Sequence, residues 1–134
     1  MEITTELKLK VMFWYTLVAS FAFGVLMLVA PEFVIETMGW PVQDPLIFGL
    51  MASLFTAEGI WSIFGIKNPR KFIPVLLMQM TYKLIWFIAV VLPTIITKTY
   101  YMESLLFTII LGTYVIGDLV AIPFKEFLAP RSTT

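Results

Sequence analysis

Three ionisable residues interrupt the long apolar stretches of this chain: Glu58, Lys83 and Asp118. An ionisable side chain in the middle of a membrane helix costs about 2.5–3.5 kcal/mol on insertion scales, so such residues usually face a bundle interior and find partners there. Two acids facing one lysine leave one carboxyl group without a cation of its own. That carboxyl group is a candidate for binding a cationic or polar ligand, or for carrying a proton.

Helical periodicity places further polar and aromatic side chains beside these charges. At 3.6 residues per turn, one face of the helix that carries Lys83 holds Gln79, Lys83, Trp86 and Val90. The opposite face, which includes Ile88, suits lipid. The predicted ligand-binding or proton-carrying residues are Glu58, Gln79, Lys83, Asp118, Tyr82, Tyr114, Trp61 and Trp86. The alternative is structural: an ion pair that only fixes how the helices fit together.

Four apolar stretches must position these residues. The chain has 134 residues, of which 60% are hydrophobic and 13% charged, whereas a soluble domain has about 25% charged residues. A helix needs roughly 17–25 residues to cross a bilayer, and the sequence predicts spans at about 11–30, 46–66, 72–93 and 103–123. We therefore expect an all-α fold, a four-transmembrane-helix bundle that forms a single membrane domain over residues 1–134.

Several prolines predict the ends of these helices. Asp44-Pro45 and Asn68-Pro69 each have the form of an N-cap residue followed by proline at the first helical position. Pro93 falls where the third span is expected to end, because proline cannot donate a helical hydrogen bond.

The segment "PEFVIETMG", residues 31–39, follows the first span. Its early proline and late glycine predict a short helix on the outer face of the membrane, with Phe33, Val34 and Met38 towards lipid. A packed loop is the alternative.

The loop charges predict an orientation. Basic residues lie before the first span, in the second connection and after the fourth span: Lys8, Lys10, Lys67, Arg70, Lys71, Lys125 and Arg131. The other two loops hold Lys98 as their only basic residue. The positive-inside rule then places both termini in the cytoplasm, in a cytoplasmic (inner) or plasma membrane.

Composition also excludes several classes of site. The chain has no cysteine and no histidine, which excludes disulfides, thiol redox chemistry, histidine-ligated haem and imidazole catalysis. Zero formal net charge gives no reason to expect a nucleic-acid partner. We predict no catalytic residue and no metal site, so an enzyme acting alone is not expected, and the sequence leaves any cofactor open.

The stretches "FGVLMLVAPEFVIETMGWP", "DPLIFGLMASLFTAEGIWSIFG", "KNPRK" and "YKLIW" resemble the small four-helix DoxX-like membrane proteins. The resemblance implies the architecture more than an activity. That superfamily includes membrane subunits associated with quinone-linked oxidoreductases and accessory factors for other membrane proteins. It supplies no catalytic residue that maps onto the three charged positions.

The sequence is therefore compatible with three functions. The first is a binding or accessory protein for a lipid, a quinone-like molecule or a membrane-protein partner, which includes a second copy of the chain. The second is a small proton- or ion-coupled transporter, which the buried carboxyl groups favour. The third is a membrane subunit of a quinone-linked oxidoreductase, which the resemblance implies.

Overall fold

The computed structural model describes residues 4–130 and is helical, with no strand among them. The elements are α1 (Thr5–Thr16), η1 (Leu17–Phe21), α2 (Ala22–Val29), α3 (Pro31–Met38), α4 (Pro45–Lys67), α5 (Ile73–Trp86), η2 (Phe87–Val91), α6 (Leu92–Ile96), η3 (Met102–Ser104), α7 (Leu105–Ala121) and α8 (Phe124–Leu128). Continuous helix over Thr5–Val29, Pro45–Lys67, Ile73–Ile96 and Met102–Ala121 is long and apolar enough to cross a membrane. The all-α class and the four candidate spans are thereby confirmed.

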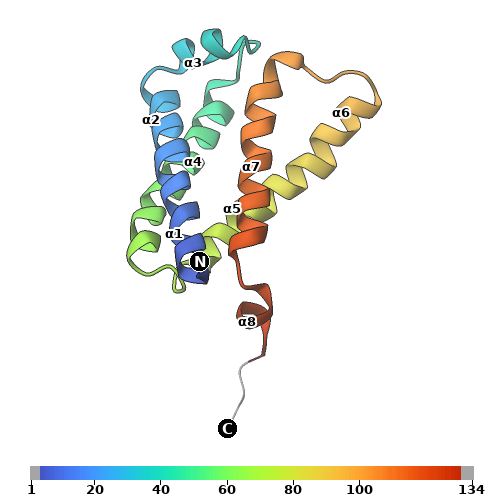
Figure 1. The fold of residues 1–134 in the computed structure, drawn as a ribbon. Helices are drawn as coiled ribbons and strands as arrows, with labels where there is room; N and C mark the ends of the chain where they lie inside the picture. Colours follow the sequence, from blue (N-terminus) through green and yellow to red (C-terminus); the bar gives the residue numbers. More distant parts are fainter. Residues whose placement is uncertain (1–3, 131–134) are drawn as a thin grey trace.

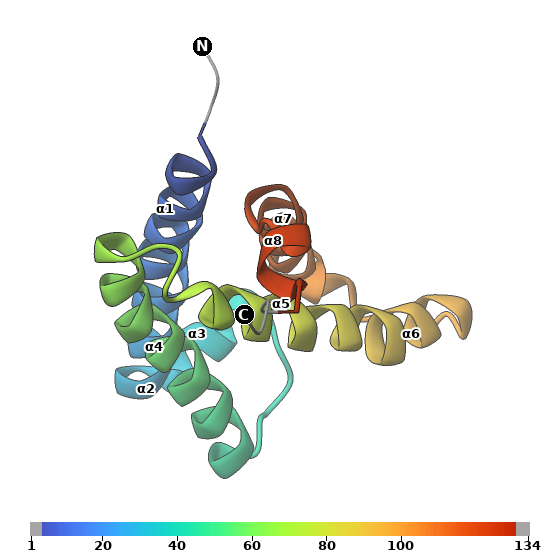
Figure 2. The same cartoon turned by 90° about the horizontal axis from the view of Figure 1, so that it is seen from below.

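The spans pack unequally (Figure 1). The first span, α1–η1–α2, lies along α4, and α7 packs against both α1 and α5. The third span, α5–η2–α6, tilts away from this group, and seen from below its far end points away from α1 and α4 (Figure 2). The residues of α6 are accordingly exposed or half-buried. The interior of the bundle is therefore concentrated where α5, rather than α6, meets the other spans.

The start of α4 follows the predicted capping pattern. The Asp44 side chain accepts hydrogen bonds from the backbone N–H groups of Leu46 at 2.9 Å and Ile47 at 3.1 Å, and Pro45 is the first helical residue. A carboxylate in this position satisfies amide groups that have no partner within the helix. The second span therefore begins one residue before its predicted start.

The second predicted cap, at Asn68, is wrong. Asn68 ends α4 instead, because its backbone N–H still donates to the Phe64 carbonyl at 2.9 Å. Pro69 then lies in the turn between the spans, and α5 begins only at Ile73, with Phe72 as its N-cap residue. The Asn68-Pro69 pair therefore ends α4 and does not begin α5.

The prediction that the third span ends at Pro93 is also wrong. The helix continues to Ile96, and a π-helical turn, η2, lies directly before α6. Proline removes one helical hydrogen bond and crowds the preceding turn, and a π turn accommodates an extra residue within a helix. The turn also shifts the inward face by one residue, so that Val91 is 5% exposed while Val90, predicted to face inward, is 48% exposed.

The segment after the first span is a helix, α3, as predicted. It lies across the upper end of the bundle (Figure 1) and ends at Gly39, which has a left-handed φ of 69°. Phe33 is exposed, but Val34 is 2% exposed and packs with Met27 and Phe48 rather than facing lipid. The reason is that α3 folds back over α2 and α4, so one of its faces closes the end of the bundle.

The contact between the first span and α4 depends on Gly24. A Cβ atom at Gly24 would lie 2.6 Å from the backbone nitrogen of Thr56 and 2.9 Å from the carbonyl oxygen of Ala52. Small residues allow membrane helices to approach this closely. We expect Gly24→Ala to lower the free energy of unfolding by about 1–3 kcal/mol, because overpacking forces the backbones apart.

Thermal unfolding in one detergent measures this effect, and Gly49→Ala is the matched control. A Cβ at Gly49 meets no atom of the described residues within 4 Å, so this variant should unfold at the wild-type temperature or slightly above it. Equal unfolding temperatures for the two variants would contradict the assigned role of Gly24.

Candidate functional site

The site is centred on Lys83, which is fully buried on α5. Its Nζ lies 3.7 Å from Oε2 of Glu58 on α4, whose side chain is 7% exposed. The same Nζ lies 4.3 Å from the ring centre of Tyr114 and 4.6 Å from that of Tyr82. A desolvated cation over an aromatic face gains about 2 kcal/mol. One carboxylate and two rings therefore surround the ammonium group.

The polar atoms of this group have unused hydrogen-bonding capacity. Among residues 4–130, the two carboxylate oxygens of Glu58, the hydroxyl of Tyr82 and Nζ of Lys83 are buried without a hydrogen-bond partner. The 3.7 Å separation of the ion pair exceeds the usual hydrogen-bond range of about 2.7–3.2 Å. A buried polar group without a partner costs about 1–3 kcal/mol, and a charged one costs more. A hydrogen-bonding group from another molecule would relieve that cost.

Asp118 belongs to a separate polar group. It is fully buried on α7, and Gln79 Nε2 donates to its Oδ2 at 3.0 Å and its Oδ1 at 3.3 Å. The Gln79 side chain also bonds Thr16, whose hydroxyl donates to the Met12 carbonyl at 2.8 Å. Within the described part of the chain, no lysine or arginine nitrogen lies within 4.0 Å of Asp118. An uncharged amide, rather than Lys83, is its direct partner.

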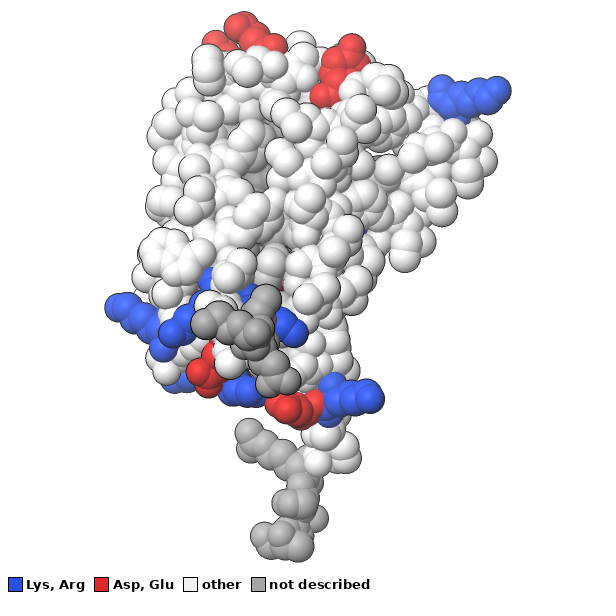
Figure 3. All heavy atoms as spheres, viewed as in Figure 1, with Lys and Arg blue, Asp and Glu red and all other residues white. Residues whose placement is uncertain are grey.

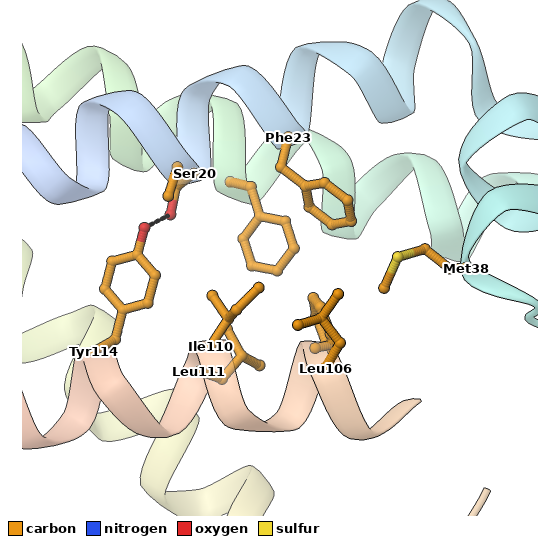
Figure 4. A pocket seen from close by; sticks show the side chains of 10 residues that line it. Ser20, Phe23, Met38, Leu106, Ile110, Leu111 and Tyr114 are labelled. Carbon is orange, nitrogen blue, oxygen red and sulfur yellow. Dashed lines mark hydrogen bonds between the residues drawn. The ribbon is translucent and has the colours of Figure 1, made fainter. Parts of the chain in front are cut away.

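The first span contributes hydroxyl groups that the sequence interpretation missed. Thr16 meets Gln79, and the Ser20 Oγ lies 2.8 Å from the Tyr114 hydroxyl, within hydrogen-bond range (Figure 4). A recognisable signal was present, since Thr16, Ser20 and Gly24 recur every four residues and so share one face of the helix.

The structure brings six of the eight predicted site residues into these two groups: Glu58, Gln79, Lys83, Asp118, Tyr82 and Tyr114. Trp86 lies nearby, with its ring centre 6.0 Å from that of Phe107. Trp61 lies elsewhere, 51% exposed and stacked on Phe72. The buried face of α4 includes Glu58 and Ser62, and Trp61 lies outside this face.

An apolar groove, here called the Lys83 groove, opens beside the ion pair. It lies between the first half of α4, which supplies Leu50 and Leu54, and the later part of α5, which supplies Tyr82, Lys83 and Trp86. Its volume is about 440 Å³, which falls within the roughly 300–1,000 Å³ of small-molecule sites. The groove therefore combines apolar walls with a charged and aromatic end.

The described residues include no group of three or more carboxylate, histidine or cysteine side chains that could hold a metal ion. The side chains of the site offer hydrogen bonds, one ion pair and apolar contact. Comparisons of the chain with protein-family models, with curated proteins and with solved structures give no match.

Proposed function

We propose that this chain is an integral membrane protein that binds an amphipathic molecule, a lipid or a quinone-like compound, in the Lys83 groove. One observation carries the proposal: Lys83 and Tyr82, whose buried polar atoms have no hydrogen-bond partner among the described residues, line an apolar groove of about 440 Å³. Glu58 does not line the groove, but its Oε2 lies 3.7 Å from Lys83 Nζ. Such a combination, mostly apolar with a few convergent polar groups, is typical of small-molecule sites. Binding between the helices of a bundle is a common arrangement.

The same atoms define the chemistry of the polar end of the ligand. Lys83 offers only donors, Glu58 in its ionised form only acceptors, and Tyr82 either. The Glu58–Lys83 pair is neutral as a whole, so a charged head group would leave one charge uncompensated in a buried site. A neutral carbonyl or hydroxyl group fits better, since it can bond to one member of the pair without separating the two.

Binding is tested by extracting the protein in a mild detergent and weighing the complexes by native mass spectrometry. We expect the wild type to retain an amphipathic molecule, and Lys83→Met to reduce its occupancy about ten-fold or more, as expected for a lost hydrogen bond to a charged group. Lys98→Met is the control, because it makes the same change at an exposed loop residue. A wild type without bound amphiphile, or equal occupancy in the two variants, would refute the proposal.

We further propose that both termini face the cytoplasm. Most basic side chains gather at the lower end of the bundle, where the turn between α4 and α5 lies, together with some acidic ones (Figure 3). The upper end carries mainly acidic side chains, with a basic one at its right in this view. Arg131, one of the predicted basic residues, lies outside the described residues. The positive-inside rule then assigns the lower end to the cytoplasm.

Single cysteines test this orientation cleanly, because the chain has none of its own. In intact cells, a membrane-impermeant thiol reagent should label Thr99→Cys, between α6 and α7, and should label Asn68→Cys only after the membrane is opened. Labelling of Asn68→Cys in intact cells would reverse the assignment.

A membrane-protein partner or a second copy of the chain is favoured by the third span. Ile88, Ile95 and Ile96 are 66%, 55% and 70% exposed on a helix that leans away from the bundle. Cross-linking in the native membrane through a cysteine at Ile95 would trap such a neighbour. Recovery of the monomer alone would count against this accessory role.

Transport is the second candidate function, and Asp118 is the observation that favours it. A buried carboxyl group bonded only to an amide among the described residues is suited to exchange a proton. Proteoliposomes should then show a pH-dependent flux that Asp118→Asn abolishes. Absence of flux in the wild type, or a flux unaffected by this variant, would exclude the transport role.

A further inference from the structure

A second apolar cavity lies next to the Lys83 groove (Figure 4). This Ser20 cavity has a volume of about 280 Å³ and lies between the first span and α7, with Ser20, Phe23, Ile110 and Tyr114 in its wall. The hydroxyl groups of Ser20 and Tyr114 lie 2.8 Å apart and so satisfy each other. The rest of the wall is hydrocarbon, aromatic ring and the Met38 thioether. A wall of this composition suits a hydrocarbon chain.

The Ser20 cavity and the Lys83 groove share part of their walls. Phe55, Phe107 and Leu111 belong to the walls of both. The ring centre of Phe107 is 6.0 Å from that of Phe23, in the Ser20 cavity, and also 6.0 Å from that of Trp86, in the Lys83 groove. Phe55 and Leu111 are 4% and 6% exposed, whereas Phe107 is only partly buried. Phe107 is therefore the least buried member of the shared wall.

We infer that the Ser20 cavity is the second half of a pocket for the hydrocarbon chain of the ligand, and that Phe107 limits the chain length the protein accepts. The inference rests on the proposed binding function and extends it. The polar end of the ligand stays at Lys83, because the hydroxyl groups of the Ser20 cavity already bond each other. Its chain runs along the Lys83 groove to Phe107, and only a longer chain that displaces this ring enters the Ser20 cavity.

The test uses linear fatty alcohols of increasing chain length, which share one neutral head group. Binding to the purified full-length protein is measured by native mass spectrometry. We expect wild-type affinity to stop rising beyond a certain length, and Phe107→Ala to shift that limit to longer chains because it joins the two cavities. Phe64→Ala, the same truncation at an exposed position of α4, should leave the limit unchanged.

A filling variant provides an independent check. Ile110 lines only the Ser20 cavity of the two, so Ile110→Trp should restore the wild-type limit when combined with Phe107→Ala. Made alone, it should weaken the binding of the longest alcohols and spare the shortest. This single variant also keeps the inference testable if Phe107→Ala fails to fold.

The outcomes separate the two proposals. If the wild type binds no alcohol of any length, the proposed binding function fails. If it binds them but neither Phe107→Ala nor Ile110→Trp changes the length dependence, the binding function stands and the role of Phe107 is overturned. If Phe64→Ala shifts the limit as much as Phe107→Ala does, the shift is not specific to the shared wall, and the inference is again overturned.

Discussion

Lys83→Met is expected to lower the free energy of unfolding by about 3–5 kcal/mol, the usual cost of removing one member of a buried ion pair. The physical reason is that Glu58, 7% exposed, would remain buried and lose its cation. Glu58→Leu should be similarly harmful, because the fully buried ammonium of Lys83 would then lack its carboxylate. Thermal or denaturant unfolding in a single detergent measures both losses.

The double variant Glu58→Leu/Lys83→Met separates stability from binding. Replacing a whole buried ion pair with apolar side chains of similar volume is often neutral or stabilising, so the double variant should recover most of the stability lost by each single one. It should not recover ligand binding, because the polar end of the groove is gone. A cycle of these variants therefore tests a structural and a binding role in the same proteins.

Two results would contradict this account. If the losses of the two single variants simply add in the double variant, then Glu58 and Lys83 are not energetically coupled. If the double variant binds the amphipathic molecule as well as the wild type does, the pair serves only to fix the packing of the helices. Lys98→Met, at an exposed loop position, should be neutral in both measurements.

Hydropathy predicted the spans well because it depends on local composition, which the lipid environment constrains strongly. The inward face of α5 was predicted equally well, since Gln79 and Lys83 are both fully buried on it. Details that depend on the packing of neighbouring helices could not be predicted from the sequence. The π turn, the tilt of α6 and the outward position of Trp61 follow from how the helices pack, and a single stripe of residues does not encode that.

The choice between the two acids shows where sequence reasoning stopped. The approximate span ends predicted from the sequence allow either Glu58 or Asp118 to reach Lys83. With the ends fixed, Lys83 lies ten residues into α5 and Glu58 nine residues before the end of α4, so at about 1.5 Å per residue their depths match. Asp118 lies only three residues before the end of α7, nearer the depth of Gln79, and the amide is its partner.

That partnership supports the second large prediction: Gln79→Leu should lower the free energy of unfolding by about 3 kcal/mol. Gln79 supplies the hydrogen bonds to both oxygens of Asp118, which is fully buried. A hydrogen bond to a charged group contributes about 1.5–3 kcal/mol, and a buried charged group left without one costs at least as much. The same unfolding assay in detergent measures the loss.

Two further variants decide whether this loss comes from Asp118. In Gln79→Leu/Asp118→Leu no carboxyl group remains to be satisfied, so most of the stability should return, because replacing both partners with apolar groups is close to neutral. Gln43→Leu makes the same substitution in the loop before α4, where the Gln43 amide bonds only the Pro41 carbonyl among the described residues, and it should be nearly silent. If Gln79→Leu is no less stable than Gln43→Leu, Asp118 does not depend on this amide, and the second polar group would have to be held by other means.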